Sequence, residues 1–149
     1  MEINIEDNFS LLFDKNNNTA YKALQTLQKE CEGSDKVYCY MDKLADMIDN
    51  DNSYIRTRGI TLIAYNAKWD KDNKIDEIID EYLKHIEDVK PITARQCIKL
   101  LPIIAKNKPE LKEDIVTALK KADISFYAES MQSLVYKDIQ NSLSEIEKL

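Results

Sequence analysis

The feature that most constrains the fold is a regular succession of short amphipathic segments separated by polar turns. Within each segment, apolar residues recur every three or four positions, as they do on the buried face of an α-helix. The chain has only two glycines and three prolines, which is too few for the many tight turns of a β-sandwich or barrel. The sequence therefore predicts an all-α fold.

The predicted helices form pairs joined by short polar turns such as EGSD, DNDNS and KDNK. Polar residues that can cap a helix, or a proline suited to the first turn, stand at several of the expected starts. The expected helices begin near Ile5, Asn18 or Thr19, Ser34 or Asp35, Ser53, Ile75, Pro91, Leu111 and Phe126.

Corresponding positions in the second helix of each pair are 34 to 37 residues apart. Ile55 precedes Ile92 by 37 residues, and Ile92 precedes Phe126 by 34. One helical hairpin per period of this length is typical of an α-solenoid, in which stacked hairpins share a continuous core. We therefore expect an α-α superhelix of about three to four hairpins.

At these positions the chain resembles HEAT and armadillo-type repeats, and the resemblance covers roughly residues 35–141. HEAT-type second helices open with a valine–arginine pair and continue with small and aliphatic residues. The residues that carry the resemblance here are Ile55-Arg56, Gly59, Leu62, Ile63 and Ala67.

A narrower resemblance rests on the segments NSYIR, AKWD and KPE. These are similar to a family of small HEAT-like proteins of low-GC Gram-positive bacteria, some of which carry a label taken from iron–sulfur scaffold proteins. The sequence has neither the β-helical pattern nor the ligand set that such a scaffold needs, so we do not carry that function over.

The expected domain organisation is a single helical-repeat domain over residues 1–149. Residues 1–33 are expected to be N-terminal capping helices, residues 34–141 the HEAT-like repeats, and residues 142–149 the end of the C-terminal helix. A first segment with Phe9 and Phe13 could act as a cap or as a docking element, because the exposed ends of a solenoid need covering.

The helix predicted from Ser53 has apolar spacing but also contains two of the three arginines and the single tryptophan. At 100° per residue, Arg56 falls on the buried face. We interpret it as a structural arginine that binds carboxylates or carbonyls of the preceding turn, such as those of Asp49 or Asp51. Arg58 falls on the opposite, outward face among aromatic residues.

The helix predicted from Pro91 repeats this arrangement, and second helices of a solenoid line one concave, binding surface. Arginine and aromatic residues are enriched at binding hot spots. The sequence thus predicts a basic and aromatic strip that binds an acidic protein or peptide segment, unless these side chains only cover neighbouring hairpins. The strip consists of Tyr54, Arg58, Tyr65, Trp69, Arg95, Lys99 and Lys106.

Two alternatives to a non-enzymatic binding module stay open. The first is a nucleic-acid-binding protein related to HEAT-like DNA glycosylases, in which Asp70 beside Trp69 would be the candidate carboxylate. The net charge of −6 argues against it, because an acidic protein is not attracted to nucleic acid or to an anionic membrane surface. The second alternative is a subunit that caps or extends a larger assembly.

The sequence predicts no catalytic, cofactor-binding or metal-binding residue. DNDNSYIRTRGI and DKDNKIDEIIDE begin like calcium loops, but each lacks the central glycine, so both are simpler as capped helix starts. His85 is the only histidine. The three cysteines are unpatterned, the start MEINIEDNF has no signal-peptide character, and no apolar run is long enough to span a membrane. We therefore expect a cytoplasmic protein.

Overall fold

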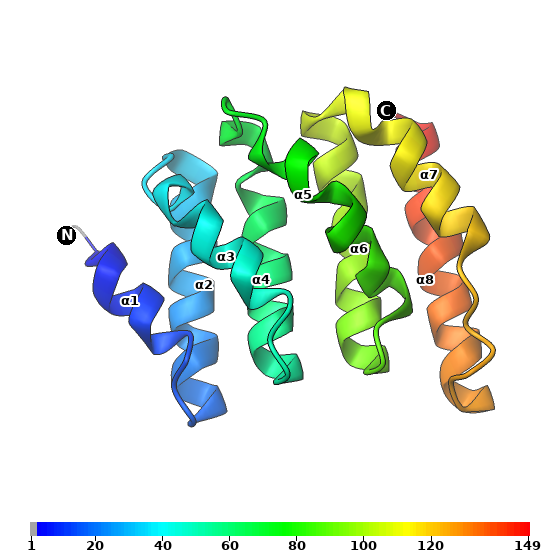
Figure 1. The fold of residues 1–149 in the computed structure, drawn as a ribbon, viewed down its shortest axis with the longest axis horizontal. Helices are drawn as coiled ribbons and strands as arrows, with labels where there is room; N and C mark the ends of the chain where they lie inside the picture. The colour runs from blue at the N-terminus through cyan, green and yellow to red at the C-terminus, as the bar shows by residue number, and fades with distance from the viewer. Residues whose placement is uncertain (1–2) are drawn as a thin grey trace.

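The fold is a row of stacked helical hairpins arranged in two layers (Figure 1). It is seen in a computed structural model that describes residues 3–149. The first layer contains the shorter helices α1 (Ile5–Leu11), α3 (Met41–Met47), α5 (Lys74–Leu83) and α7 (Lys112–Lys121). The second layer contains α2 (Asn17–Gly33), α4 (Ser53–Tyr65), α6 (Pro91–Asn107) and α8 (Glu129–Glu147). This arrangement confirms the predicted all-α superhelix.

The helix starts show how local sequence sets the hairpins. Asn16 caps α2 by accepting hydrogen bonds from two backbone N–H groups of the first turn, and Asn52 caps α4 by accepting one. The predicted caps at Asn18 or Thr19 and at Ser53 are therefore wrong by one to three residues. Pro91 occupies the first turn of α6, as predicted.

The period of the second-layer helices is slightly longer than predicted. They begin at Asn17, Ser53, Pro91 and Glu129, which are 36, 38 and 38 residues apart. Phe126 precedes α8 instead of starting it, because residues 122–128 form a connection in which Ser125 binds the Asp123 carboxylate. The 34-residue spacing from Ile92 to Phe126 was therefore misleading.

The core lies between the two layers and runs through all the hairpins. Its largest fully buried side chains include Leu27, Leu44, Ile63 and Ile98. At the crossing of α3 and α4 the helices approach very closely, because a Cβ on Gly59 would lie 2.8 Å from Met47 Cβ. Only glycine fits at this position without displacing α3.

Two buried polar networks tie successive hairpins together. In the first, Arg56 of α4 binds the Asp88 carboxylate, with Nη2–Oδ1 and Nε–Oδ2 distances of 2.7 and 3.0 Å. Its Nη1 also donates to the carbonyls of Asn50 and Asp51. The structural interpretation of Arg56 is thus confirmed, with Asp51 contributing its carbonyl and Asp88 contributing the carboxylate. His85 lies 2.7 Å from the same carboxylate.

The second network lies at the C-terminal ends of α4 and α6. Lys108, which is 5 % exposed, lies 3.2 Å from Asp70 and 2.7 Å from Asp76. Asp70 also accepts a hydrogen bond from Tyr38 and from two backbone N–H groups at the start of α5. The two networks fix α4 and α6 relative to each other near both ends.

Within residues 3–149, none of the helices has the length and apolar character needed to cross a membrane.

Candidate binding groove

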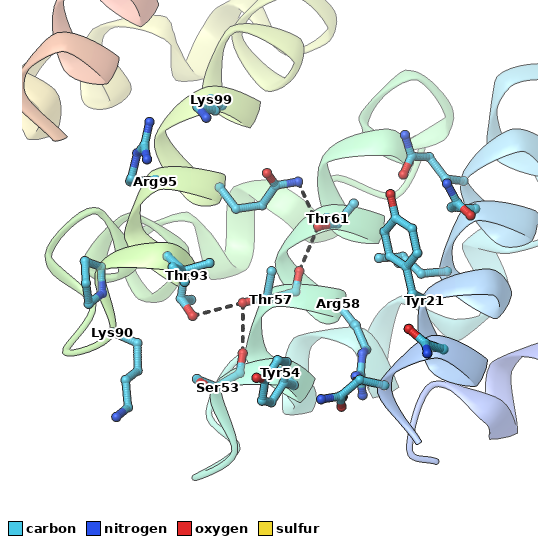
Figure 2. Close-up of a pocket in the computed structure, with 18 of the residues that line it drawn as sticks. Tyr21, Ser53, Tyr54, Thr57, Arg58, Thr61, Lys90, Thr93, Arg95 and Lys99 are labelled. Carbon is cyan, nitrogen blue, oxygen red and sulfur yellow. Dashed lines mark hydrogen bonds between the residues drawn. The ribbon is translucent and has the colours of Figure 1, made fainter. Parts of the chain in front are cut away.

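The face formed by the second-layer helices is hollowed by a groove of about 1190 Å³. One wall is α2 and the other is the first half of α6, while α4 lies between them (Figure 2). Met131 at the start of α8 closes one corner. The groove therefore runs along α4 and draws its lining from four consecutive hairpins.

The floor consists of short side chains one helical turn apart: Ser53, Thr57 and Thr61. The Thr57 hydroxyl donates to the Ser53 carbonyl at 2.8 Å and lies 2.9 Å from the hydroxyl of Thr93. The Thr61 hydroxyl donates to the Thr57 carbonyl and accepts from Gln96. The hydroxyls of the two threonines on the floor are thus already engaged within the protein, as the dashed lines in Figure 2 show.

The walls carry longer side chains. The α6 wall is mainly cationic and apolar, with Ile92 74 % exposed. The α2 wall is rich in amides and contains Tyr21, which is 57 % exposed. The lining residues of the α2 wall are Asn17, Asn18, Tyr21, Leu24, Gln25, Gln28, Lys29 and Glu32.

The groove is positive on a protein whose net charge is −6. Among the described residues, five cationic side chains and one carboxylate line it. They are Lys29, Arg58, Lys90, Arg95 and Lys99, and Glu32. A recess lined by one sign of charge concentrates the electric field and attracts groups of the opposite sign.

The positive charge is not uniform along the groove. The helices α2, α4, α6 and α8 all run in the same direction, so their N-termini lie along one edge (Figure 1). Each N-terminus carries the positive end of the helix dipole. Arg58 and Lys90 stand near this edge, whereas Lys29 and Glu32 lie together near the C-terminal end of α2. Within the lining itself, positive charge is therefore concentrated toward the N-terminal edge.

The predicted strip is divided by the structure. Tyr54, Arg58, Arg95 and Lys99 line the groove, and Tyr54 and Lys99 are exposed there. Tyr65, Trp69 and Lys106 are not part of its lining. The strip is thus not one continuous surface.

The prediction that Arg58 points outward is wrong. Its side chain enters the interface with the first hairpin, where Nη1 donates to the Leu12 carbonyl at 2.8 Å and Nη2 donates to Asn17 Oδ1. Arg58 is only 6 % exposed. Burial lowers its pKa, although the attraction of Tyr54 and Asp14 opposes this effect. Both of these acceptors are neutral, so Arg58 adds a positive charge beneath the groove wall that the nearby Asp14 offsets only in part.

Trp69 lies outside the groove because α4 ends before it. The α-helix stops at Tyr65, and residues Ala67–Trp69 form a 3-10 turn, so a helical projection no longer applies. The indole N–H donates to the Cys31 carbonyl at 2.7 Å. Tyr65 is half-buried against the core, and Lys106 is exposed in the last turn of α6.

Arg95 lines the groove but is already paired. Its Nε donates to the Asp138 carboxylate of α8 at 2.6 Å, which raises the pKa of Arg95. Its side chain is 28 % exposed and still contributes to the lining of the groove (Figure 2). Lys90 and Lys99 are the exposed lysines of this wall.

The α2 wall of the groove was not predicted from the sequence. Residues 1–33 were expected to form a cap, whereas in the structure α2 lines the groove and exposes Tyr21 there. The signal was available, because Asn17, Gln25 and Gln28 form a polar face on α2 that is rich in amides.

Asp70, the carboxylate that the glycosylase alternative required, does not line the groove. It is buried and bonded to Tyr38, to two backbone N–H groups of α5 and to Lys108. Burial tends to raise the pKa of Asp70, but these hydrogen bonds lower it below its usual value. Its contacts are those of a carboxylate that holds the hairpins together.

The stacked hairpins and the groove along one layer define an α-solenoid of the kind that mediates protein interactions. The chain belongs to the HEAT repeat domain family, whose model matches residues 2–143. No curated protein and no solved structure matches the chain.

Proposed function

We propose that this protein is a non-enzymatic binding module whose groove takes an acidic segment of a partner protein. The observation that carries this proposal is the sign of the groove: within residues 3–149, one carboxylate and five cationic side chains line it, of which Arg95 is paired with Asp138, on a chain of net charge −6. An acidic segment would be attracted into the groove, and the rest of the surface would repel it.

The shape and composition of the groove support the same function. Its lining includes the exposed side chains Tyr21, Tyr54 and Ile92, and aromatic and apolar anchors of this kind supply much of the affinity of protein interfaces. The two networks around Asp88 and Lys108 hold α4 and α6 in place, so the groove is formed before a partner arrives. Preorganisation of this kind reduces the entropy lost on binding.

The test is a selection of displayed random 16-residue peptides on the folded protein, followed by titration of the enriched peptides. We expect the enriched peptides to be acidic. The charge reversal Lys90→Glu/Lys99→Glu should weaken their binding by about tenfold or more, since rim charges set the attraction of a segment to its site. The matched control is Lys36→Glu/Lys71→Glu, which changes the charge equally at two exposed lysines outside the groove.

Equal binding to the groove variant and to the control variant would contradict the proposal, and so would enriched peptides without an excess of acidic residues. A fluorescent single-stranded oligonucleotide provides a further arm. If the protein binds that probe, and if this binding weakens steeply with salt and is lost in the groove variant, the result would favour the nucleic-acid alternative instead.

A further inference from the structure

We infer that the segment taken by the groove is an amphipathic α-helix of about three turns, lying along α4 and running in the opposite direction. This inference rests on the proposed function, because it describes the occupant of the same groove. Three features carry it: the engaged hydroxyls of the floor, the dimensions of the groove, and the charge gradient along it.

The floor favours a helix over an extended chain. Every backbone N–H and C=O of an extended segment needs a partner when it is buried. The hydroxyls of Thr57 and Thr61 already bond to Ser53, Thr93, Gln96 and a backbone carbonyl of α4. A helix satisfies its own backbone groups and needs only van der Waals contact from this part of the floor.

The dimensions also fit a helix. The α2 wall extends from Asn17 to Glu32, a length of about 22 Å, and the α6 wall from Pro91 to Lys99, about 12 Å. Short side chains on α4 between taller walls let a helix axis approach closely, as in ordinary helix packing. A helix of about three turns is about 16 Å long and matches this span.

The free polar groups lie on the walls, where they would meet the flanks of a seated helix. The amides of Gln25 and Gln28 on α2 and the ammonium of Lys99 on α6 face the groove. These amides and this ammonium are placed to bind polar and acidic side chains of the bound helix, at the boundary of its apolar face. Tyr21 and Ile92, both largely exposed, would cover that apolar face.

The charge gradient sets the direction. The N-termini of α2, α4 and α6 lie along one edge of the groove (Figure 1). Arg58 is in the second turn of α4 and Lys90 is the residue before α6, so both are close to this edge. The negative end of a helix dipole is its C-terminus. A bound helix therefore places its C-terminal turn, with its acidic side chains, at this edge and runs antiparallel to α4.

The test uses three synthetic peptides of about 14 residues, each with a Leu/Ala face and a hydrocarbon staple that holds the helix. The first peptide has glutamates in its last turn, the second has the reversed sequence with glutamates in its first turn, and the third is the first peptide with a central proline and no staple. Each carries a nitroxide at its C-terminus.

We expect the proline peptide to bind about a hundredfold more weakly than the first, since a central proline breaks a helix. We expect the first peptide to bind about two- to fivefold more tightly than the reversed peptide, as a dipole effect of this size implies. Its nitroxide should broaden the amide resonances of Ser53 and Ile92 and leave those of Lys29 and Glu32 sharp.

The outcomes separate this inference from the function on which it rests. If the proline peptide binds as tightly as the first and is weakened by Lys90→Glu/Lys99→Glu, the occupant is extended, and only the inference fails. Broadening near Lys29 and Glu32 instead would overturn the direction. If all three peptides bind the Lys90→Glu/Lys99→Glu variant as tightly as the wild type, the groove is not the binding site.

Discussion

Arg56 on α4 and Asp88 before α6 form a bidentate ion pair between neighbouring hairpins. Both side chains are almost fully buried, with 10 % and 3 % of their surfaces exposed. A charge buried in this way is stable only while its partner is present. The pair therefore fixes the spacing of α4 and α6, and with it the distance from the floor of the groove to one of its walls.

The first prediction is that Asp88→Ala lowers the free energy of unfolding by about 3–5 kcal/mol, because it leaves the guanidinium of Arg56 buried without its carboxylate. Urea denaturation followed by circular dichroism measures the change. Asp80→Ala removes an exposed carboxylate from α5 and should change the stability by less than about 0.5 kcal/mol. Similar losses in the two variants would show that the pair has no special role.

The second prediction concerns pH. Burial tends to raise the pKa of Asp88, but hydrogen bonds from His85, Arg56 and the backbone of Lys90 lower it far below its usual value. The pKa of Asp70 is also lowered. In the unfolded chain both carboxyls regain a pKa of about 3.9, so at low pH the unfolded state binds protons that the folded state does not.

The stability that these carboxylates provide is therefore complete above about pH 5 and decreases as the pH falls through and below 4. Urea titrations at a series of pH values across this range should show the decrease in the free energy of unfolding. The decrease should be smaller in Asp88→Asn, which has no carboxyl to protonate at this position. An equal acid-induced decrease in the wild type and in Asp88→Asn would contradict this assignment.

The third prediction compares the two glycines. Gly59→Ala places a Cβ 2.8 Å from Met47 Cβ and 3.1 Å from the Leu44 carbonyl, so α3 must move away. We expect a loss of about 1–3 kcal/mol despite the higher helix propensity of alanine. Gly33→Ala meets no atom within 4 Å and should be neutral or stabilising by up to about 1 kcal/mol. Thermal denaturation of the two variants gives the comparison. A Gly59→Ala variant as stable as the wild type would be inconsistent with the close crossing of α3 and α4.

The fourth prediction tests the structural role of Arg58. Arg58→Met removes the hydrogen bond to the Leu12 carbonyl and should release α1 from the row of hairpins. Hydrogen exchange read by mass spectrometry should become faster in peptides covering Ile5–Leu11 and remain unchanged in peptides from α8. Lys99→Met, at an exposed position of the groove, should leave exchange in α1 unchanged. If hydrogen exchange in α1 is the same in Arg58→Met as in the wild type, Arg58 does not hold α1 in place.

The fifth prediction compares two lysines of the α6 end. Lys108→Met leaves the carboxylate of Asp70, whose side chain is fully buried, without its cation, and should cost about 3–5 kcal/mol. Lys106→Met alters an exposed side chain and should cost less than about 0.5 kcal/mol. Both values follow from urea denaturation. Equal stability of the two variants would mean that the network around Lys108 does not hold the hairpins.

The stacking of hairpins could be predicted from the sequence because it depends on local patterns. The apolar spacing within each helix and the position of Pro91 are local, and both were confirmed. The role of Arg56 was also predictable in part, because the helical projection placed it on the buried face. Its main partner, Asp88, was not found, since it lies 32 residues away in the next hairpin.

The site could be predicted only in part because a helical projection describes one helix without its neighbours. Arg58 does fall on the side facing the groove, but α1 and α2 cover it, and no pattern within α4 contains that information. Trp69 was misplaced because the projection continued past Tyr65, where the helix ends. Lys99 was placed correctly because α6 is regular along its whole groove wall.

The most direct test of the groove as the binding surface is amide chemical-shift mapping of the wild-type protein with an acidic peptide from the selection. The predicted result is a set of shifts confined to the facing sides of α2, α4 and α6, centred on Thr57, Thr61 and Gln96. Shifts centred instead on α3, α5 and α7, or around Phe9 and Phe13, would place binding on another surface and contradict the proposed function.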